Sequence, residues 1–239
     1  MKRILFLYPV KALFFLSSMG MIVCATAVAQ EYKYEIGGMA GMSMYMGDVN
    51  QTKFFQGWHP AAGAVFRKNF NLRWALKADL LMGKVDGDTQ NTENVFPANA
   101  QISFSRNFYE LGGQMEFNFL PYSDKYAYLN TSKTAPYVLT GLGLTFAPGD
   151  DRAFLGLNWA LGVGIKYKIR NRINLGLEYA VRKLFRDDFD APGKADELNL
   201  NNPYQFETSR TKNNDWYSTL MFSVTWDFGP NKKNCNNLE

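Results

Sequence analysis

Apolar and polar residues alternate one by one along most of this chain. In residues 155–169 every second position is apolar, from Leu155 to Ile169, and the positions between them are glycine, alanine, asparagine or lysine. Side chains of a β-strand point alternately to two faces, so this period of two predicts strands, whereas no segment shows a convincing helical period. The predicted strands are residues 32–46, 60–68, 72–82, 109–119, 136–146, 155–169, 173–182 and 216–228, of which 60–68 and 136–146 have the weakest pattern.

The lengths of these strands and of their connections predict a membrane barrel. Most of the strands have 9 to 15 residues, whereas strands of soluble proteins usually have about 5 or 6, and about 9–11 tilted residues cross a bilayer. Tight turns at Phe70 and Asn171 alternate with longer polar connections. Short turns at one end and long loops at the other are typical of outer-membrane barrels. The long connections are residues 47–57, 87–102, 147–153 and 184–213. Residues 121–134 are the exception, because they form a long connection on the short-turn side.

Alternation alone does not say which face points inward, since a lipocalin-like soluble barrel alternates too and keeps its apolar face inside. Here the polar face combines small residues with charges of both signs, which suits the narrow lumen of an eight-stranded barrel. The apolar face carries aromatic residues near strand ends, as an interfacial girdle requires; these are Phe119, Tyr167, Tyr179, Trp216 and Phe228. We therefore expect an all-β, eight-stranded antiparallel up-and-down transmembrane β-barrel with a plugged polar lumen and lipid outside.

The predicted lumen charges belong to Lys77, Asp79, Glu110, Glu116, Lys166, Lys168, Glu178 and Arg182. Unpaired buried charges cost several kcal/mol, so charges of opposite sign on neighbouring strands are expected to pair, with Lys166 and Lys168 near Glu178 and Arg182. Eight strands leave room for side chains and not for a water channel, which argues against a diffusion pore.

The N-terminus predicts export. Met1-Lys2-Arg3 is followed by an apolar run, residues 12–23, and by Ala27-x-Ala29, which together are typical of a secretory signal peptide. A retained membrane anchor and a lipoprotein at Cys24 are the alternatives, but the run is short for a span and no small residue precedes Cys24. The expected organisation is a signal peptide at 1–29, an outer-membrane barrel at 30–229 and a periplasmic tail at 230–239.

Composition excludes several classes of protein. Hydrophobic residues make up 46% and aromatic residues 15% of the chain, which excludes intrinsic disorder. Two cysteines and one histidine cannot supply a disulfide framework or a Cys/His metal cage. Loss of the signal peptide would lower the formal charge from +4 to +1, so we expect no nucleic-acid partner.

Candidate chemistry is sparse. His59 is the only histidine. Small outer-membrane barrels can carry a Ser–His esterase site, but no serine motif in this sequence singles out a partner for His59. The acidic stretch 187–197 offers oxygen ligands of the kind that calcium prefers, yet its spacing matches no ligand loop, and its cation binding stays open. A lone Gly141-Leu-Gly143 lacks the strand–helix context of a nucleotide loop. We therefore expect no catalytic residue, no metal site and no cofactor.

The turn side carries the candidate partner contacts. An even number of strands places both termini in the periplasm, beside the long connection 121–134. Tyrosine is enriched at the cores of protein–protein interfaces. The tyrosines of this connection would equally fit the aromatic belt at the membrane surface. The candidate contacts are Tyr122, Tyr126, Tyr128, Lys232 and Lys233.

Several stretches together resemble a known family. They are residues 45–48, 135–143 and 161–168, with Glu178, Arg182 and the Asp-aromatic-Asp group within 186–190. The chain resembles the PorG-like outer-membrane barrels, a component of the type IX secretion system of Bacteroidetes-type bacteria. One departure is that the Asp-aromatic-Asp group here follows a basic segment, residues 182–186.

The resemblance implies a barrel without catalytic residues that attaches at its periplasmic face to the ring proteins of the secretion machinery. Its partners would be outer-membrane lipid and those ring proteins. The alternative is a stand-alone small barrel that acts as a surface adhesin or a lipid-modifying enzyme. The two differ in the end that recognises a partner: the anchor uses residues 121–134 and the tail, and the alternative uses the long loops.

Overall fold

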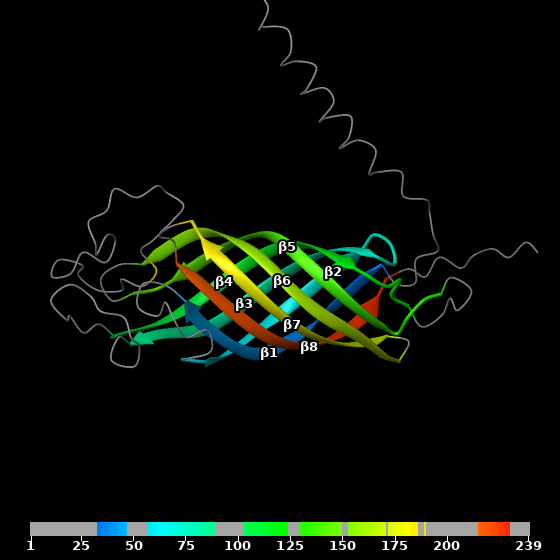
Figure 1. Cartoon of the computed structure of the whole chain (residues 1–239), viewed down its shortest axis with the longest axis horizontal. Helices are drawn as coiled ribbons and strands as arrows, with labels where there is room; N and C mark the ends of the chain where they lie inside the picture. Colours follow the sequence, from blue (N-terminus) through cyan, green and yellow to red (C-terminus); the bar gives the residue numbers. More distant parts are fainter. Residues whose placement is uncertain are drawn as a thin grey trace, which may run out of the picture.

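In the computed structural model, eight antiparallel strands form a closed barrel in which each strand pairs with the next and β8 pairs with β1 (Figure 1). The structure describes residues 33–46, 57–88, 103–123, 130–149, 153–170, 172–185, 189 and 215–229. The strands are β1 (Tyr34–Met46), β2 (His59–Asn69), β3 (Trp74–Asp88), β4 (Ser103–Asn118), β5 (Thr134–Ala147), β6 (Phe154–Arg170), β7 (Ile173–Leu184) and β8 (Trp216–Phe228). The predicted all-β, eight-stranded up-and-down barrel is confirmed.

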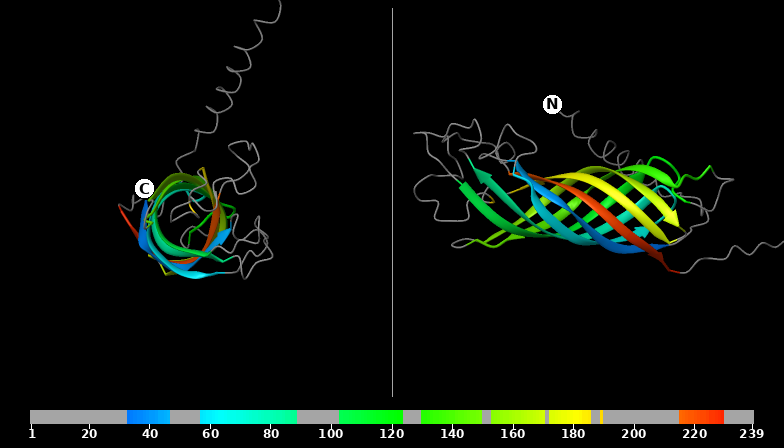
Figure 2. Two further views of the ribbon diagram at one scale, coloured as in Figure 1. Left: turned by 90° about the vertical axis from the view of Figure 1, so that its left-hand side faces the viewer. Right: turned by 90° about the horizontal axis from the view of Figure 1, so that it is seen from below.

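Closure removes every sheet edge. The pairing of β1 with β8 runs over the whole of both strands, from Tyr34↔Phe228 to Met46↔Trp216, and the view down the axis shows a complete ring (Figure 2). A closed sheet satisfies the backbone groups of all its strands, which is the condition for strands to lie in hydrocarbon. No helix within the described ranges is long and apolar enough to cross a membrane.

The two faces of the sheet differ as the lipid-outside interpretation predicts. Large apolar side chains point outward and are more than half exposed at Leu80, Leu111, Leu142, Leu157 and Val163, whereas the predicted lumen charges are buried. A soluble lipocalin-like barrel would show the reverse, so that alternative is wrong. The exposed apolar surface of this face is too large for a protein surrounded by water, whereas it is expected where the wall contacts lipid.

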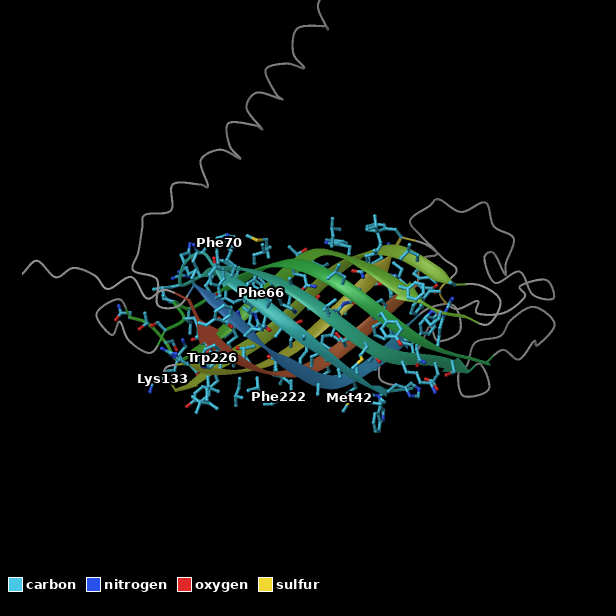
Figure 3. All side chains as sticks on the ribbon, turned by 180° about the vertical axis from the view of Figure 1, so that it is seen from behind. Met42, Phe66, Phe70, Lys133, Phe222 and Trp226 are labelled. Carbon is cyan, nitrogen blue, oxygen red and sulfur yellow. The ribbon has the colours of Figure 1, made fainter. Side chains whose placement is uncertain are left out.

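Aromatic side chains gather toward the ends of the outer wall. Trp74, Phe119, Tyr167 and Trp226 are exposed at the turn end, and Trp216 is exposed at the loop end. Figure 3 shows Phe66, Phe70 and Trp226 at one end, with Phe222 and Met42 further along the wall. The sequence-based assignment of Tyr179 to this girdle is wrong, because Tyr179 lies near the middle of β7 and is half-buried.

β3 and β4 extend beyond their predicted ends on the loop side. They pair from Gly83↔Phe108 to Asp88↔Ser103, six residues past the predicted strand end at 82. The pattern inverts in this extension: Val85 and Phe108 point inward and are buried, while Lys84 is exposed on the outer face. Where the barrel wall extends beyond the membrane, its outer face is polar. The alternation of apolar and polar residues therefore ends before the strands end.

Candidate functional site

The lumen holds a network of paired charges, and all eight predicted lumen residues are part of it. At its centre, Lys77 Nζ lies 2.5 Å from Glu178 Oε1 and 3.2 Å from Asp79 Oδ2. The Tyr137 hydroxyl donates to the other oxygen of Glu178, at 2.8 Å. Gln114 donates to Asp79 Oδ1 at 3.1 Å. Glu178 therefore faces one cation and one neutral donor, and Asp79 faces Lys77, Gln114 and also Arg182, whose Nη2 lies 3.9 Å from Oδ2.

A second group on the turn side of the centre is built around Glu116. Arg67 Nε donates to both oxygens of Glu116, at 2.9 and 3.1 Å, and Lys166 Nζ also donates to Glu116. Arg67 in turn reaches Glu35, with Nη1 3.5 Å from Oε2. Lys166 also lies over the ring of Tyr137, 4.7 Å from its centroid. Glu116 thus holds two cations, and its side chain is fully buried.

Two further groups complete the network. On the loop side, Arg182 Nε lies 2.7 Å from Glu110 Oε2, and the Tyr217 hydroxyl donates to the same oxygen at 2.5 Å. At the turn end, Lys168 Nζ lies 2.8 Å from Asp227 Oδ2. Asn174 donates to the other oxygen of Asp227 at 2.6 Å. The charged groups are therefore paired along the length of the described lumen.

The predicted pairing between neighbouring strands is wrong for the sixth and seventh strands. Lys166 pairs with Glu116 on β4, and Glu178 pairs with Lys77 on β3, so these contacts cross the lumen. The reason lies in the register: Lys166 stands opposite Gly176 and Glu178 stands opposite Gly164. Glycine on the adjacent strand offers no partner, and in a narrow barrel long side chains meet across the axis.

Sequence reasoning missed three members of this network, Glu35, Arg67 and Asp227. All three are at least 97% buried. The signal was available, because each lies at an inward-facing position of its strand. Arg67 and Asp227 are two residues from the buried Val65 and Thr225, and Glu35 is four residues from the buried Met39. A strict count of parity along β1, β2 and β8 would have found them.

The mouth of the lumen on the loop side is closed by an apolar cluster that includes one residue from the longest connection. Phe189 is fully buried and packs against Tyr217 and Phe154, with ring centroids 5.8 and 5.3 Å away. Its backbone N–H donates to Asp215 Oδ2 at 3.2 Å, and Arg106 donates to its carbonyl at 2.9 Å. The aromatic residue of the Asp-aromatic-Asp group therefore sits inside the barrel.

The turn end is covered by the base of the 119–133 connection. Tyr122 and Ser132 form a parallel bridge, and Ser132 N–H donates to Pro121 O at 2.8 Å. The Tyr122 hydroxyl donates to Asn174 at 2.8 Å, and Lys168 Nζ lies over the Tyr122 ring.

The hypothesis that Tyr122 contacts a partner is wrong, because this side chain is only 8% exposed and faces the lumen network. Tyr126, Tyr128, Lys232 and Lys233 lie outside the described residues.

The candidate chemical groups give no reactive site. His59 Nε2 lies 2.7 Å from Asp86 Oδ1 at the loop end. Ser43 stands opposite His59 in the β1–β2 register, but its hydroxyl donates to Lys84 O at 2.6 Å. Within the described ranges no three metal-ligating side chains come together, and the acidic stretch 187–197 lies almost wholly outside them. The described residues around His59 thus form structural contacts and no reactive pair.

These features define the class of protein: a small eight-stranded barrel with the fold of outer-membrane proteins. The chain matches the family model described as "Domain of unknown function (DUF6089)" over residues 13–237, and it belongs to that family. A comparison with curated proteins gave no match.

Several solved structures are similar to this chain. Neisserial surface protein A is 12% identical, with a TM-score of 0.50, over 82% of this chain and 97% of that chain. The attachment invasion locus protein Ail of Yersinia pestis is 15% identical, with a TM-score of 0.44, over 83% of this chain and 100% of that chain. OprG from Pseudomonas aeruginosa is 11% identical, with a TM-score of 0.45, over 84% of this chain and 98% of that chain. At these identities the similarity concerns the fold alone.

Proposed function

We propose that this chain is an integral outer-membrane protein that anchors a type IX secretion apparatus through its periplasmic face, without catalysing a reaction. The observation that carries this proposal is the lumen, whose described part is filled by paired charges and closed at the loop-side mouth by an apolar cluster. A barrel whose described residues form neither a passage nor a reactive group is best suited to act through a surface. The remaining question is which surface.

Opening a passage through the lumen would cost free energy. Separating a buried ion pair so that one charge is left unpaired costs about 3–5 kcal/mol. A passage along the axis would have to break several such pairs, including Lys77–Glu178 and Arg182–Glu110. The interior is therefore best interpreted as a rigid support for the two ends of the barrel.

The turn end favours attachment. Most turns on this side of a barrel are short, whereas the connection between β4 and β5 spans residues 119–133. Its base is held by backbone hydrogen bonds from Tyr122 N–H to Leu72 O at 3.0 Å and from Ser123 N–H to Ser132 O at 3.1 Å. A connection that is held at both of its ends can present the residues between them to a partner. The assignment of that partner to the type IX ring comes from the PorG-like resemblance.

The alternative is a stand-alone adhesin or lipid-modifying enzyme, which would act through the loop end. The single histidine there is paired with Asp86, and the nearest serine in the register, Ser43, is fully buried. An enzyme that acts on lipid would need a hydroxyl open to its substrate. The adhesin alternative is separated from the anchor by experiment.

The experiment replaces the chromosomal copy in the source bacterium with variants and measures two outputs: proteins captured with the barrel from solubilised membranes, and type IX cargo in the medium. One variant lacks residues 231–239 and carries Tyr126→Ser and Tyr128→Ser. Its matched control carries Tyr204→Ser and Phe206→Ser on the loop side. The anchor predicts that the first variant inserts normally, loses the ring proteins and secretes less cargo, while the control behaves as wild type.

Two results would refute the proposal. One is normal cargo secretion when the whole barrel is deleted. The other is unchanged recovery of periplasmic proteins with the turn-side variant, combined with a loss of cell attachment in the loop-side control, which would favour the adhesin.

A further inference from the structure

A basic aromatic patch lies on the outer wall at the turn end of β8, β1 and β2. We define it by its three cations, Lys33, Lys68 and Arg172, and by five rings: Tyr34, Phe66, Phe70, Trp226 and Phe228. All of these rings except Phe70 form a continuous layer. The Tyr34 centroid is 5.8 Å from Phe66 and 5.6 Å from Phe228, and Phe228 stacks on Trp226 at 6.0 Å.

Each cation of the patch lies over an aromatic ring. Lys33 Nζ is 5.7 Å from the centroid of Tyr34, Lys68 Nζ is 5.5 Å from that of Phe70, and Arg172 Cζ is 5.7 Å from that of Trp226. These contacts hold the cations against the outer wall. Trp226, Phe66 and Phe70 are between 38% and 47% exposed, so the patch faces sideways from the barrel (Figure 3).

The charge of this end of the barrel is one-sided. Arg73 and Lys133 are also exposed at this end. The acidic residues near the turns within the described ranges, Glu35, Glu116 and Asp227, are buried and paired inside the lumen. Among the residues that the structure describes at this end, the acidic side chains are therefore paired in the lumen and the exposed charges are positive.

The composition and position of the patch identify its occupant. Aromatic side chains and basic residues meet at the level of lipid headgroups, where the rings lie at the interface and the cations attract anionic lipid. Next to the patch, toward the membrane centre, the outward positions of β1 and β2 are small: Gly38 stands opposite Ala64, and Ala40 stands opposite Ala62. These residues leave room along the wall for acyl chains below a bound headgroup.

We infer that the basic aromatic patch binds the phosphate headgroup of an anionic phospholipid in the leaflet that faces the periplasm, with the acyl chains along β1 and β2. An acidic protein would need cations that point away from the membrane, whereas these lie along the lipid-facing wall. The inference rests on the membrane placement in the proposed function and is independent of the secretion role.

The test uses the full mature barrel folded into dioleoylphosphatidylcholine vesicles. In one version only Trp226 is kept, and Trp58, Trp74, Trp159 and Trp216 become Phe. In a second version only Trp216, at the opposite end, is kept. Phosphatidylglycerol or phosphatidylcholine that is brominated near the carbonyl end of its chains is added, and quenching of tryptophan fluorescence gives the relative affinity of each site for the two lipids.

We expect Trp226 to report a preference for phosphatidylglycerol of at least about fivefold, since each basic residue near a membrane surface contributes on the order of that factor. The triple variant Lys33→Gln, Lys68→Gln and Arg172→Gln should reduce it below about twofold. The matched control, Lys84→Gln and Lys183→Gln at the loop end, should leave the preference at Trp226 unchanged. Lys183 Nζ lies 5.0 Å from the ring of Trp216 and so provides a comparable contact there.

Equal quenching of Trp226 by both lipids would overturn the inference and leave the membrane placement intact. Quenching by neither lipid would show that the wall does not face lipid, which would overturn the proposed placement and the inference together. An unchanged lipid preference in the triple variant, combined with loss of a captured periplasmic protein, would reassign the patch to a protein contact.

Discussion

Replacing Glu116 by Gln tests whether the lumen charges hold the barrel together. Glu116 is fully buried and pairs with both Arg67 and Lys166. The change keeps the shape of the side chain but removes its charge, so it should leave two buried cations that share less negative charge. We expect the folded barrel to lose stability.

The size of the expected loss of stability depends on the contacts that Arg67 and Lys166 keep in the variant. Breaking a buried ion pair on one side costs about 3–5 kcal/mol. Arg67 keeps Glu35, with the closest atoms 3.5 Å apart. Lys166 keeps the face of Tyr137, a contact worth about 0.5–2 kcal/mol. These residual contacts reduce the expected loss in the free energy of unfolding to about 2–4 kcal/mol.

The assay is urea unfolding from lipid vesicles, followed by tryptophan fluorescence. Lys166→Gln added to Glu116→Gln removes one of the two stranded cations, so the double variant should be at least about 1 kcal/mol more stable than Glu116→Gln alone. Glu197→Gln, on the loop side, controls for the change in net charge and should cost less than about 0.5 kcal/mol. The reasoning is refuted if Glu116→Gln lies within about 0.5 kcal/mol of wild type, or if the double variant is no more stable than the single.

Three other predictions concern the outer wall, the passage and the mouth. Leu161→Arg, at mid-strand on the outer face, should cost about 2–4 kcal/mol in the same assay and Leu161→Ala much less, and equal costs would contradict the lipid-facing assignment. Purified protein in planar bilayers should give no stable open channel, and large regular conductance steps would refute the plugged lumen. Phe189→Ala should cost about 3 kcal/mol or more, because the fully buried ring fills the mouth. A cost below about 1 kcal/mol would mean that the ring does not close the mouth.

The sequence predicted the fold well because a barrel in lipid repeats one physical rule at every position. The pattern predicts strands wherever the outer face is apolar. It ends at Met82 and Tyr109, because polar residues such as Lys84 occupy the outer face beyond them. Alternation gives each residue a face, and this is why the eight lumen charges could be named from parity.

The pairing of those charges and the fate of Tyr122 could not be predicted in the same way. Parity says that Lys166 points inward, but not which side of the lumen its amine reaches, because that depends on barrel diameter and on glycine at the neighbouring position Gly176. Tyr122 lies beyond the strand pattern, and its burial depends on a bridge to Ser132 that local sequence does not reveal. Contacts between residues distant in sequence decide both cases.

Replacing Gly162 shows the same limit. Its inward-facing position alone would suggest that a small polar residue is tolerated there. A Cβ atom at Gly162 would lie 2.8 Å from Tyr179 O and 2.9 Å from the Ala180 Cβ. Even Ala is therefore expected to disturb the pairing of β6 with β7 and to lower the stability measurably.

The ion pairs that cross the lumen join strands that are far apart in the chain, and this constrains how the protein evolves and assembles. Lys77 and Glu178 are separated by 101 positions, and Glu110 and Arg182 by 72. In an assembly intermediate that lacks its last strands, some lumen charges would have no partner. Intermediates in which β1 and β8 are not yet paired should therefore be unstable, and the barrel should close in a concerted step. Across homologues, a charge lost from one wall should be matched by a change on the opposite wall, so that the paired positions vary together even though no local segment links them.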